Sequence, residues 1–344
     1  MRICIVTLVK SINSGSYWQA RALGLVLEKL GHSVCYYDYD YTLKYRMQNY
    51  KGILDMIISQ DMSEGIKYAK SLRSFSRLQR GLPLTKEIDA INCFVLGSDT
   101  IWNLESENLT AKFDELWGRA FRDKKVITYA GSVANACEEL FKNDSRIDEA
   151  VSSWFAISVR DQYTREIIAK HTSKQIKLVC DPTLLLQKAD YAGMTEHSKD
   201  SDFIFLYTFK DLSAEQSDAL ASFAKRNKLK IVQGVNGKRR KAADYSVENS
   251  PISFLQHMLN ARYVVTDTFH GTMFSINLHK QFVAINRGKN KVNEALQSFG
   301  FADRLVSDDA GFMDRLTTTI DYNVRMQEID RLREESLDFL KSNL

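Results

Sequence analysis

Short β-branched segments alternate with helical segments along almost the whole chain. The first strand candidate, 3–9, is followed by turn residues at 13–16 and by a helical pattern over 17–30. Further strand candidates lie at 33–39, 92–96, 125–129, 156–159, 177–180, 203–209, 230–235, 263–266 and 281–285. Helical patterns occupy 161–170, 213–227, 251–261, 271–278 and 290–299. This alternation predicts an α/β fold with mostly parallel, doubly wound sheets.

The chain is long enough for two domains. Its 344 residues, 44% of them hydrophobic, exceed what one compact core usually holds. The polar stretch 187–202 lacks a clear period and separates two blocks of alternating elements, so we expect domains at 1–190 and 200–320 that face a common cleft. The remaining 321–344 is predicted as a long amphipathic helix packed across both domains.

Composition excludes several classes of protein. Lys and Arg number 47 against 43 Asp and Glu, an excess too small to predict nucleic-acid binding. Five scattered cysteines and six histidines show no disulfide framework and no metal-ligand spacing, so we expect reduced, mostly buried thiols and neither a metal nor a cofactor. No apolar run approaches the roughly 20 residues that cross a bilayer, which predicts a cytoplasmic protein.

The segment N-S-G-S-Y-W-Q at 13–19 directly follows the first strand and opens a helix. Exposed amides at a helix start favour anions or sugar hydroxyls, so Asn13 and Ser16 are candidate acceptor-binding residues. An ordinary turn in which Asn and Ser cap the helix explains the segment equally well. With one glycine it is not the G-x-G-x-x-G dinucleotide fingerprint, which argues against a nicotinamide enzyme.

The segment L-G-S-D-T-I-W-N at 96–103 leaves another strand. Ser98 and Asn103 offer hydrogen bonds to hydroxyls, and Asp99 could accept a proton from an attacking hydroxyl. Trp102 would give a sugar ring an apolar face. The competing interpretation, slightly favoured by the sequence alone, makes Trp102 a core residue and Asp99 a helix cap.

Arg160 stands where a predicted strand gives way to a helix, and its planar fork suits phosphate or carboxylate. An ion pair of Arg160 with Asp161 or Asp181 is the competing account. Asp181 precedes Pro182 and is as suited to forming a turn as to a site.

The segment T-D-T-F-H-G-T at 266–272 is the most informative one. It places the imidazole of His270 at a strand-to-helix switch among small hydroxyl residues, where backbone amides near Thr268, Gly271 and Thr272 could hold phosphate. Proton exchange near neutral pH suits such a histidine. The chain carries no P-loop, no G-x-S-x-G and no H-E-x-x-H, which removes the commonest nucleotidase, hydrolase and zinc-protease classes.

At these positions the sequence resembles the polysaccharide pyruvyl transferase family. The matching pieces are N-x-G-S-Y-x-Q-A at 13–20, G-S-D-x-x-W-N at 97–103, Y-A-G-S at 129–132, S-V-R at 158–160, D-P-T at 181–183 and D-T-F-H-G at 267–271. They occur in the family's order from the first strand to about residue 300.

The resemblance implies a Rossmann-like, two-domain fold like that of GT-B glycosyltransferases. It also implies transfer of a pyruvyl group from phosphoenolpyruvate to a sugar of a glycan precursor, giving a ketal and phosphate. Carried over to this chain, the resemblance makes His270 and Arg160 serve the phosphoenolpyruvate. From the chemistry of ketal formation we expect His270 to be the general acid, Arg160 to hold phosphate or carboxylate, and Asp99 to orient or deprotonate the acceptor. Some members have arginine where this chain has Thr268, so Arg287, Lys289 or Lys291 would have to replace that cation. A lipid-linked oligosaccharide acceptor would bring the protein to the inner face of a membrane.

Two other functions stay open. A GT-B glycosyltransferase that uses a nucleotide sugar would share the domain layout, because fold alone does not define function. A catalytically silent carbohydrate-binding protein would explain Thr268 in place of arginine.

Overall fold

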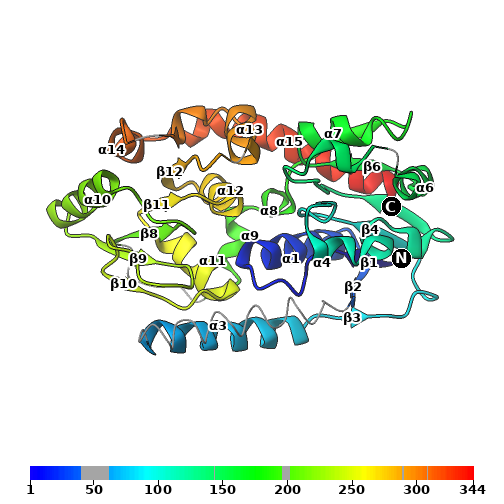
Figure 1. The fold of residues 1–344 in the computed structure, drawn as a ribbon, viewed down its shortest axis with the longest axis horizontal. Coiled ribbons are helices and arrows are strands. Elements are labelled where there is room, and N and C mark those ends of the chain that lie inside the picture. Colours follow the sequence, from blue (N-terminus) through cyan, green and yellow to red (C-terminus); the bar gives the residue numbers. More distant parts are fainter. Residues whose placement is uncertain (40–61, 143, 196–201, 289, 308) are drawn as a thin grey trace.

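The computed structural model describes residues 1–39, 62–142, 144–195, 202–288, 290–307 and 309–344. Two parallel sheets dominate it, one in each half of the chain (Figure 1). The first has the order β3-β2-β1-β4-β5 and contains β1 (Arg2–Val6), β2 (Ser33–Tyr37), β3 (Leu84–Thr85), β4 (Cys93–Leu96) and β5 (Lys125–Thr128). Isolated bridges from Ile127 to Ala156 and from Gly131 to Val159 connect it to the parallel pair β6 (Ile157–Val159) and β7 (Ile176–Leu178).

The second sheet has the order β10-β9-β8-β11-β12-β13, and its neighbouring strands pair in parallel. Its strands are β8 (Phe203–Tyr207), β9 (Lys230–Gln233), β10 (Tyr245–Ser246), β11 (Tyr263–Thr266), β12 (Gln281–Ile285) and β13 (Leu305–Val306). All five residues of β8 are buried, as expected for a central parallel strand covered on both faces.

Helices connect the strands in both halves. The first half contains α1 (Ser14–Lys29), α3 (Met62–Arg80), α4 (Glu107–Thr110), α5 (Phe113–Leu116), η1 (Arg119–Phe121), η2 (Glu138–Leu140), α6 (Ser145–Ser153), α7 (Gln162–Ile168), α8 (Pro182–Leu185) and α9 (Lys188–Ala192). The second half contains α10 (Ala214–Arg226), α11 (Pro251–Asn260), α12 (Phe269–Asn277), α13 (Asn290–Ser298), η3 (Ala302–Arg304), α14 (Phe312–Thr317) and α15 (Tyr322–Asn343).

Helix α15 packs across both halves, as predicted from its amphipathic pattern. At its start, the Tyr322 hydroxyl donates to the carbonyl of Lys280 in the second half, at 2.5 Å. Farther along, the Arg333 Nε donates to the carbonyl of Leu184 at 2.5 Å, and Ser336 Oγ accepts from the amide of Cys180 at 2.9 Å. The helix therefore joins the second half to the edge of the first.

The α/β class and the two Rossmann-like halves agree with the sequence prediction, whereas details differ. The short edge strands β3, β10 and β13 had no counterpart among the strand candidates, since two residues carry no period. The stretch predicted as a linker contains α9, so part of it is helical, while 196–201 lies outside the described residues. The domain limits at 190 and 200 stay a prediction.

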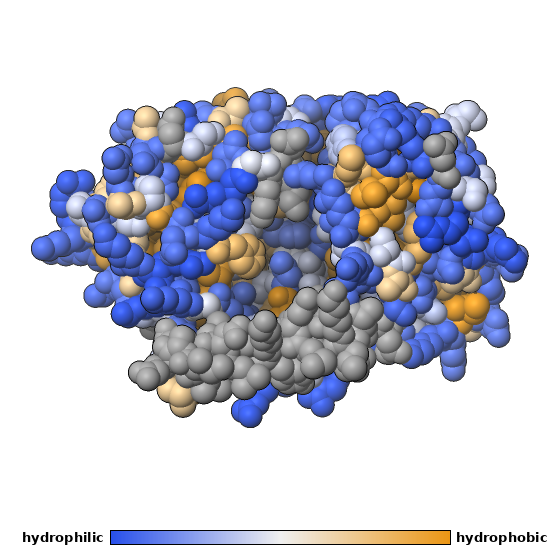
Figure 2. All heavy atoms as spheres, in the orientation of Figure 1, coloured by the Kyte–Doolittle hydropathy of each residue, from blue (hydrophilic) through white to orange (hydrophobic). Residues whose placement is uncertain are grey.

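The five cysteines are free and all but Cys137 are buried, as expected. In the parts of the chain that the structure covers, no helix is long and apolar enough to span a membrane. One face of the molecule is hollowed near its centre, between the two halves (Figure 2).

Candidate functional site

Both sheets reverse their strand order at the first strand, and ligands of open α/β sheets bind outside the carboxyl ends of the strands at this point. In the first sheet β1 lies between β2 and β4, and in the second β8 lies between β9 and β11. The loop after β1 leads into α1, and the loop after β4 carries Asp99. The loop after β11 leads into α12 and carries His270. Arg160, Asp181 and Arg287, also discussed below, follow β6, β7 and β12.

Asp99 is fixed in place by the loop and by the start of α1. Its Oδ2 accepts a hydrogen bond from Ser16 Oγ at 2.6 Å, and its Oδ1 accepts from the amide of Thr100 at 2.8 Å. The residue is buried and has a φ of 77°, a left-handed conformation that is uncommon outside glycine and concentrates at functional sites. The carboxylate of Asp99 is therefore held in a defined orientation at the end of β4.

The loop after β11 is held equally firmly. Asp267 accepts hydrogen bonds from the amides of Phe209 at 2.8 Å and Lys210 at 3.1 Å, which ties the ends of β8 and β11 together. Thr268 caps α12 by accepting from the amide of Gly271 at 2.9 Å. The helix begins at Phe269, two residues earlier than predicted, so His270 lies in its first turn rather than before it.

His270 lies where the two halves meet. A Cβ built on Gly15, near the start of α1, would come within 2.2 Å of its Nδ1. On the other side of the ring, Nε2 is 3.8 Å from Asp181 Oδ2. The imidazole is thus packed against the backbone of the first half and faces a carboxylate from the same half.

Asp181 also binds Arg160. The Arg160 Nη1 donates to Asp181 Oδ2 at 2.8 Å, and its Cζ lies 4.3 Å from the centroid of the Phe269 ring. Burial opposes the charge on this guanidinium, but the carboxylates of Asp181, Asp99 and Asp161 outweigh burial and raise the pKa of Arg160. Arg160 is therefore a permanent cation. The ion pair with Asp181, which was the alternative to a donor-binding role, is present in the structure.

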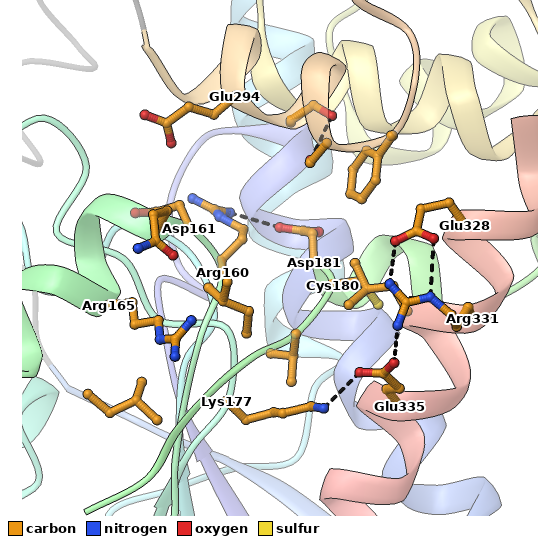
Figure 3. Close-up of a pocket in the computed structure, with 18 of the residues that line it drawn as sticks. Arg160, Asp161, Arg165, Lys177, Cys180, Asp181, Glu294, Glu328, Arg331 and Glu335 are labelled. Atoms are coloured by element: carbon orange, nitrogen blue, oxygen red, sulfur yellow. Dashed lines mark hydrogen bonds and ion pairs between the residues drawn. The ribbon is translucent and has the colours of Figure 1, made fainter. Parts of the chain in front are cut away.

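A cavity of about 710 Å³ opens beside this ion pair. Arg160, Asp181 and Phe269 form part of its wall, whereas His270 does not line it. Figure 3 shows Arg160 and Asp181 pointing toward each other at the cavity, and Arg331 from α15 held by its own carboxylates on the far side. Among the described contacts the Arg160 guanidinium donates one hydrogen bond, from Nη1, so its other N–H groups can serve an anion that enters this cavity.

Trp102 does not face the site. Its side chain is 0% exposed, its Nε1 donates to the carbonyl of Leu116 at 3.0 Å, and its ring stacks on Trp154 at a centroid distance of 5.0 Å. The prediction that Trp102 stacks on a sugar is therefore wrong, because the rings of Trp102, Trp117 and Trp154 form part of the core.

Three of the predicted acceptor-binding residues have local structural tasks. Asn13 caps α1 by accepting from the amides of Gly15 at 2.8 Å and Ser16 at 3.1 Å. Ser98 is fully buried and bonds Gln19, and Asn103 accepts from the amide of Glu105 at 3.0 Å. The capping interpretation of 13–19 thus holds for Asn13, and Ser98 supports the loop from behind rather than facing a cleft.

The predicted phosphate-binding amides after His270 are engaged within the protein. The amide of Gly271 donates to Thr268 Oγ1, and that of Thr272 donates to the Thr268 carbonyl at 3.1 Å. Both residues are buried, so neither of these two amides is open to an anion. This corrects the donor-binding role predicted for Thr268, Gly271 and Thr272.

Arg287 lies beside the same loop. Its Nε is 3.7 Å from Asp267 Oδ2, and its Nη2 donates to the carbonyl of Asp211 at 2.6 Å. A guanidinium therefore stands next to the residue preceding Thr268. Lys289 lies outside the described residues, and the side chain of Lys291 is likewise not described.

Gly15 and Asp181 are the site residues to which the sequence pointed least clearly. The sequence identified Gly15 only as a glycine in a turn, and nothing in the sequence predicted its contact with His270. Asp181 carried a better signal, because the competing account of Arg160 already named Asp181, beside Asp161, as a possible partner. No group of three or more potential metal ligands occurs among the residues that the structure describes.

Comparisons with known proteins agree with the fold. Residues 13–289 match the family profile described as polysaccharide pyruvyl transferase. Among solved structures, UDP-GlcNAc 2-epimerase from Neisseria meningitidis is 10% identical with a TM-score of 0.57, and the match covers 99% of this chain and all of that one. Another UDP-N-acetylglucosamine 2-epimerase is 11% identical with a TM-score of 0.55, over 99% and 96% of the two chains.

The glycotransferase of kitacinnamycin is 14% identical with a TM-score of 0.50, over 100% of this chain and 99% of that one. At these identities the likeness shows a shared GT-B fold and nothing about substrates. A comparison with curated proteins gives no significant match.

Proposed function

Because the chain belongs to the polysaccharide pyruvyl transferase family, we propose that it transfers a pyruvyl group from phosphoenolpyruvate to two hydroxyls of a sugar. The products are a pyruvate ketal and inorganic phosphate. The observation that carries the proposal is the position of His270, in the first turn of α12 between Gly15 and Asp181, at the meeting of the two switch points.

The reaction needs a proton donor. His270 delivers a proton to the methylene carbon of the enol, which becomes a methyl group and leaves a cationic carbon at C2. A sugar hydroxyl attacks C2 and loses its proton, the bond from C2 to the phosphate oxygen breaks, and a second hydroxyl closes the ring with loss of its proton. Asp181 Oδ2 lies 3.8 Å from His270 Nε2, so a carboxylate stands beside the ring that would deliver this proton.

The donor is an anion and needs cations. Arg160 lines the 710 Å³ cavity, and the N–H groups of its guanidinium that do not bond Asp181 can bind the phosphate or carboxylate there. Arg287 beside Asp267 supports the idea that a second guanidinium replaces the arginine that some family members have at the position of Thr268.

The acceptor side is the first half of the chain. Asp99 accepts from Ser16 and Thr100, so its carboxylate is already oriented by two donors before a sugar arrives. We assign it the task of orienting the attacking hydroxyl or accepting its proton. Ser16, which bonds Asp99 directly, positions this carboxylate. A lipid-linked oligosaccharide is included among the candidate acceptors, with peripheral membrane contact.

The test is incubation of the protein with phosphoenolpyruvate and a panel of free and lipid-linked glycans, measuring phosphate release and the mass gain of the sugar. His270→Asn should lower turnover by about 10²–10⁴-fold, the usual contribution of general acid catalysis, while the fold persists. His171→Asn is the matched control. It removes an imidazole that lies outside the site, where its Nδ1 is 2.7 Å from Asp148 Oδ1.

Unchanged turnover in His270→Asn would refute the assignment. Binding and turnover of a nucleotide sugar, with no phosphate released from phosphoenolpyruvate, would favour the glycosyltransferase alternative. Sugar binding without either reaction would favour a silent carbohydrate-binding protein.

A further inference from the structure

Helix α3 presents one continuous exposed stripe. Its exposed positions include Met62, Ile66, Lys70, Arg73, Arg77 and Arg80, which follow one another at steps of four or three residues. Such spacing places the six side chains on a single face of the helix. We call this set of six the α3 stripe.

The α3 stripe has an apolar end and a basic end. Met62 is 58% exposed and Ile66 is 54% exposed, so two large apolar side chains lie in solvent within one turn of each other. The other four positions are cations, and none of them forms an ion pair with a residue in the described ranges. The only acidic residue of the helix, Glu64, is buried on the opposite side.

The opposite side of α3 binds both halves of the protein. Lys67 Nζ donates to Ser246 Oγ at 2.5 Å, and Ser71 bonds the carbonyl of Asn249, both from the second half. Gln79 Nε2 donates to the carbonyl of Ser11 at 3.1 Å, in the loop that leads to α1. The helix therefore lies along one edge of the molecule beneath both halves (Figure 1), and the six residues of the α3 stripe are exposed.

We propose that the α3 stripe docks the protein on an anionic lipid surface, with Met62 and Ile66 entering the boundary between headgroups and acyl chains. A helix of 19 residues, about 28 Å long, can lie in the plane of a membrane with this pattern of apolar and basic residues. Four cations on one face, without an ion pair to any described residue, match a negative lipid surface. Exposed Met62 and Ile66 distinguish this partner from a nucleic acid or an acidic glycan, which offer no apolar phase to receive them.

The binding of the α3 stripe to lipid does not depend on the proposed function. Its purpose does rest on that function, because docking would bring the site to lipid-linked acceptors. The Asn249 carbonyl that Ser71 binds belongs to the residue whose side chain accepts from Ser14 Oγ, next to Gly15, at 3.2 Å. The protein-facing side of α3 is thus two contacts away from the backbone that packs against His270.

The experiment is flotation of the full chain with two kinds of vesicle, pure phosphatidylcholine and equal parts of phosphatidylcholine and phosphatidylglycerol. We expect binding to the anionic vesicles only, weakened as the Debye length falls from about 10 Å at 0.1 M salt to about 3 Å at 1 M. Replacing the four cations by glutamine (K70Q, R73Q, R77Q and R80Q together) should weaken binding by about 10²–10³-fold. The single substitution Ile66→Ser should also weaken binding to the anionic vesicles relative to the wild type.

The matched control removes four exposed cations elsewhere, as K225Q, R226Q, K228Q and K230Q together, and should bind like the wild type. Equal binding of both quadruple variants would overturn the proposal. So would binding to double-stranded DNA or heparin as tight as to anionic vesicles and unaffected by Ile66→Ser. Phosphate release with a free glycan measures the reaction separately, so loss of vesicle binding with intact turnover, or the reverse, tells the two proposals apart.

Discussion

Replacing Gly15 by alanine tests the contact between the two halves at His270. The added Cβ would lie 2.2 Å from Nδ1, 2.3 Å from Cγ and 2.6 Å from Cβ of that histidine, whereas carbon atoms in contact are about 3.5–4.0 Å apart. The imidazole must therefore move by more than about 1 Å, and the nearest atoms belong to the ring itself. A misplacement of about 1 Å can lower turnover by about 10²-fold.

The effect on stability should be smaller than the effect on turnover. Overpacking costs about 1–3 kcal/mol, but alanine lowers the entropy of the unfolded chain and favours the helix, which offsets about 0.4–1 kcal/mol. We expect Gly15→Ala to fold, with the free energy of unfolding reduced by about 0–2.6 kcal/mol, the difference between those ranges. The assays are phosphate release from phosphoenolpyruvate with a glycan acceptor and urea unfolding.

Gly24→Ala is the matched control. It lies in the same helix, and its Cβ would meet the Tyr36 hydroxyl at 2.1 Å, far from His270 in the fold. This variant should lose stability with little change in turnover. A Gly15→Ala protein with wild-type kcat and KM would refute either the packing of His270 on α1 or the role of His270 in the reaction.

Two further predictions concern the core and the pH dependence of stability. Trp102→Ala should reduce the free energy of unfolding by about 3–5 kcal/mol in urea titration, whereas a raised KM without loss of stability would restore the sugar-stacking hypothesis. Burial lowers the pKa of Lys280 from 10.5 to about 8, so the unfolded chain binds the proton more tightly and stability should rise with pH between these values, by up to about 1.4 kcal/mol per pH unit. Urea midpoints measured from pH 8 to pH 10 should show this slope in the wild type and a flatter one in Lys280→Met; equal slopes would contradict it.

The fold was predictable because both sheets are parallel and covered on two faces. Strands such as Phe203–Tyr207 are then short apolar runs, which the sequence displays directly. The site was predictable only where a side chain stands at the end of such a run, as His270 and Asp99 do. Each of them follows a buried strand, and the strand order brings the strand ends of each sheet together.

Contacts between the two halves could not be predicted in the same way. Gly15 meets His270 where one half of the chain packs on the other, and no local pattern in either segment encodes that approach. Trp102 illustrates the complementary error, since a tryptophan in a polar loop suits a sugar or a core equally well until Trp154 is placed against it. The capping role of Thr268 was hidden for a similar reason, because the helix starts two residues earlier than its apolar period suggests.

The path of α15 has a consequence for the synthesis of the protein. The amide of Cys180 and the carbonyl of Leu184, at the edge of the first half, find their partners on Ser336 and Arg333. During synthesis α15 emerges from the ribosome after every strand of both sheets. While the second half is being made, the polar groups at this edge of the first half therefore lack their partners on α15, and the apolar residues beside them stay exposed. We therefore expect the nascent first half to be the stage most exposed to chaperones and to aggregation, and the edge at Cys180 and Leu184 to be covered only when α15 folds back onto it.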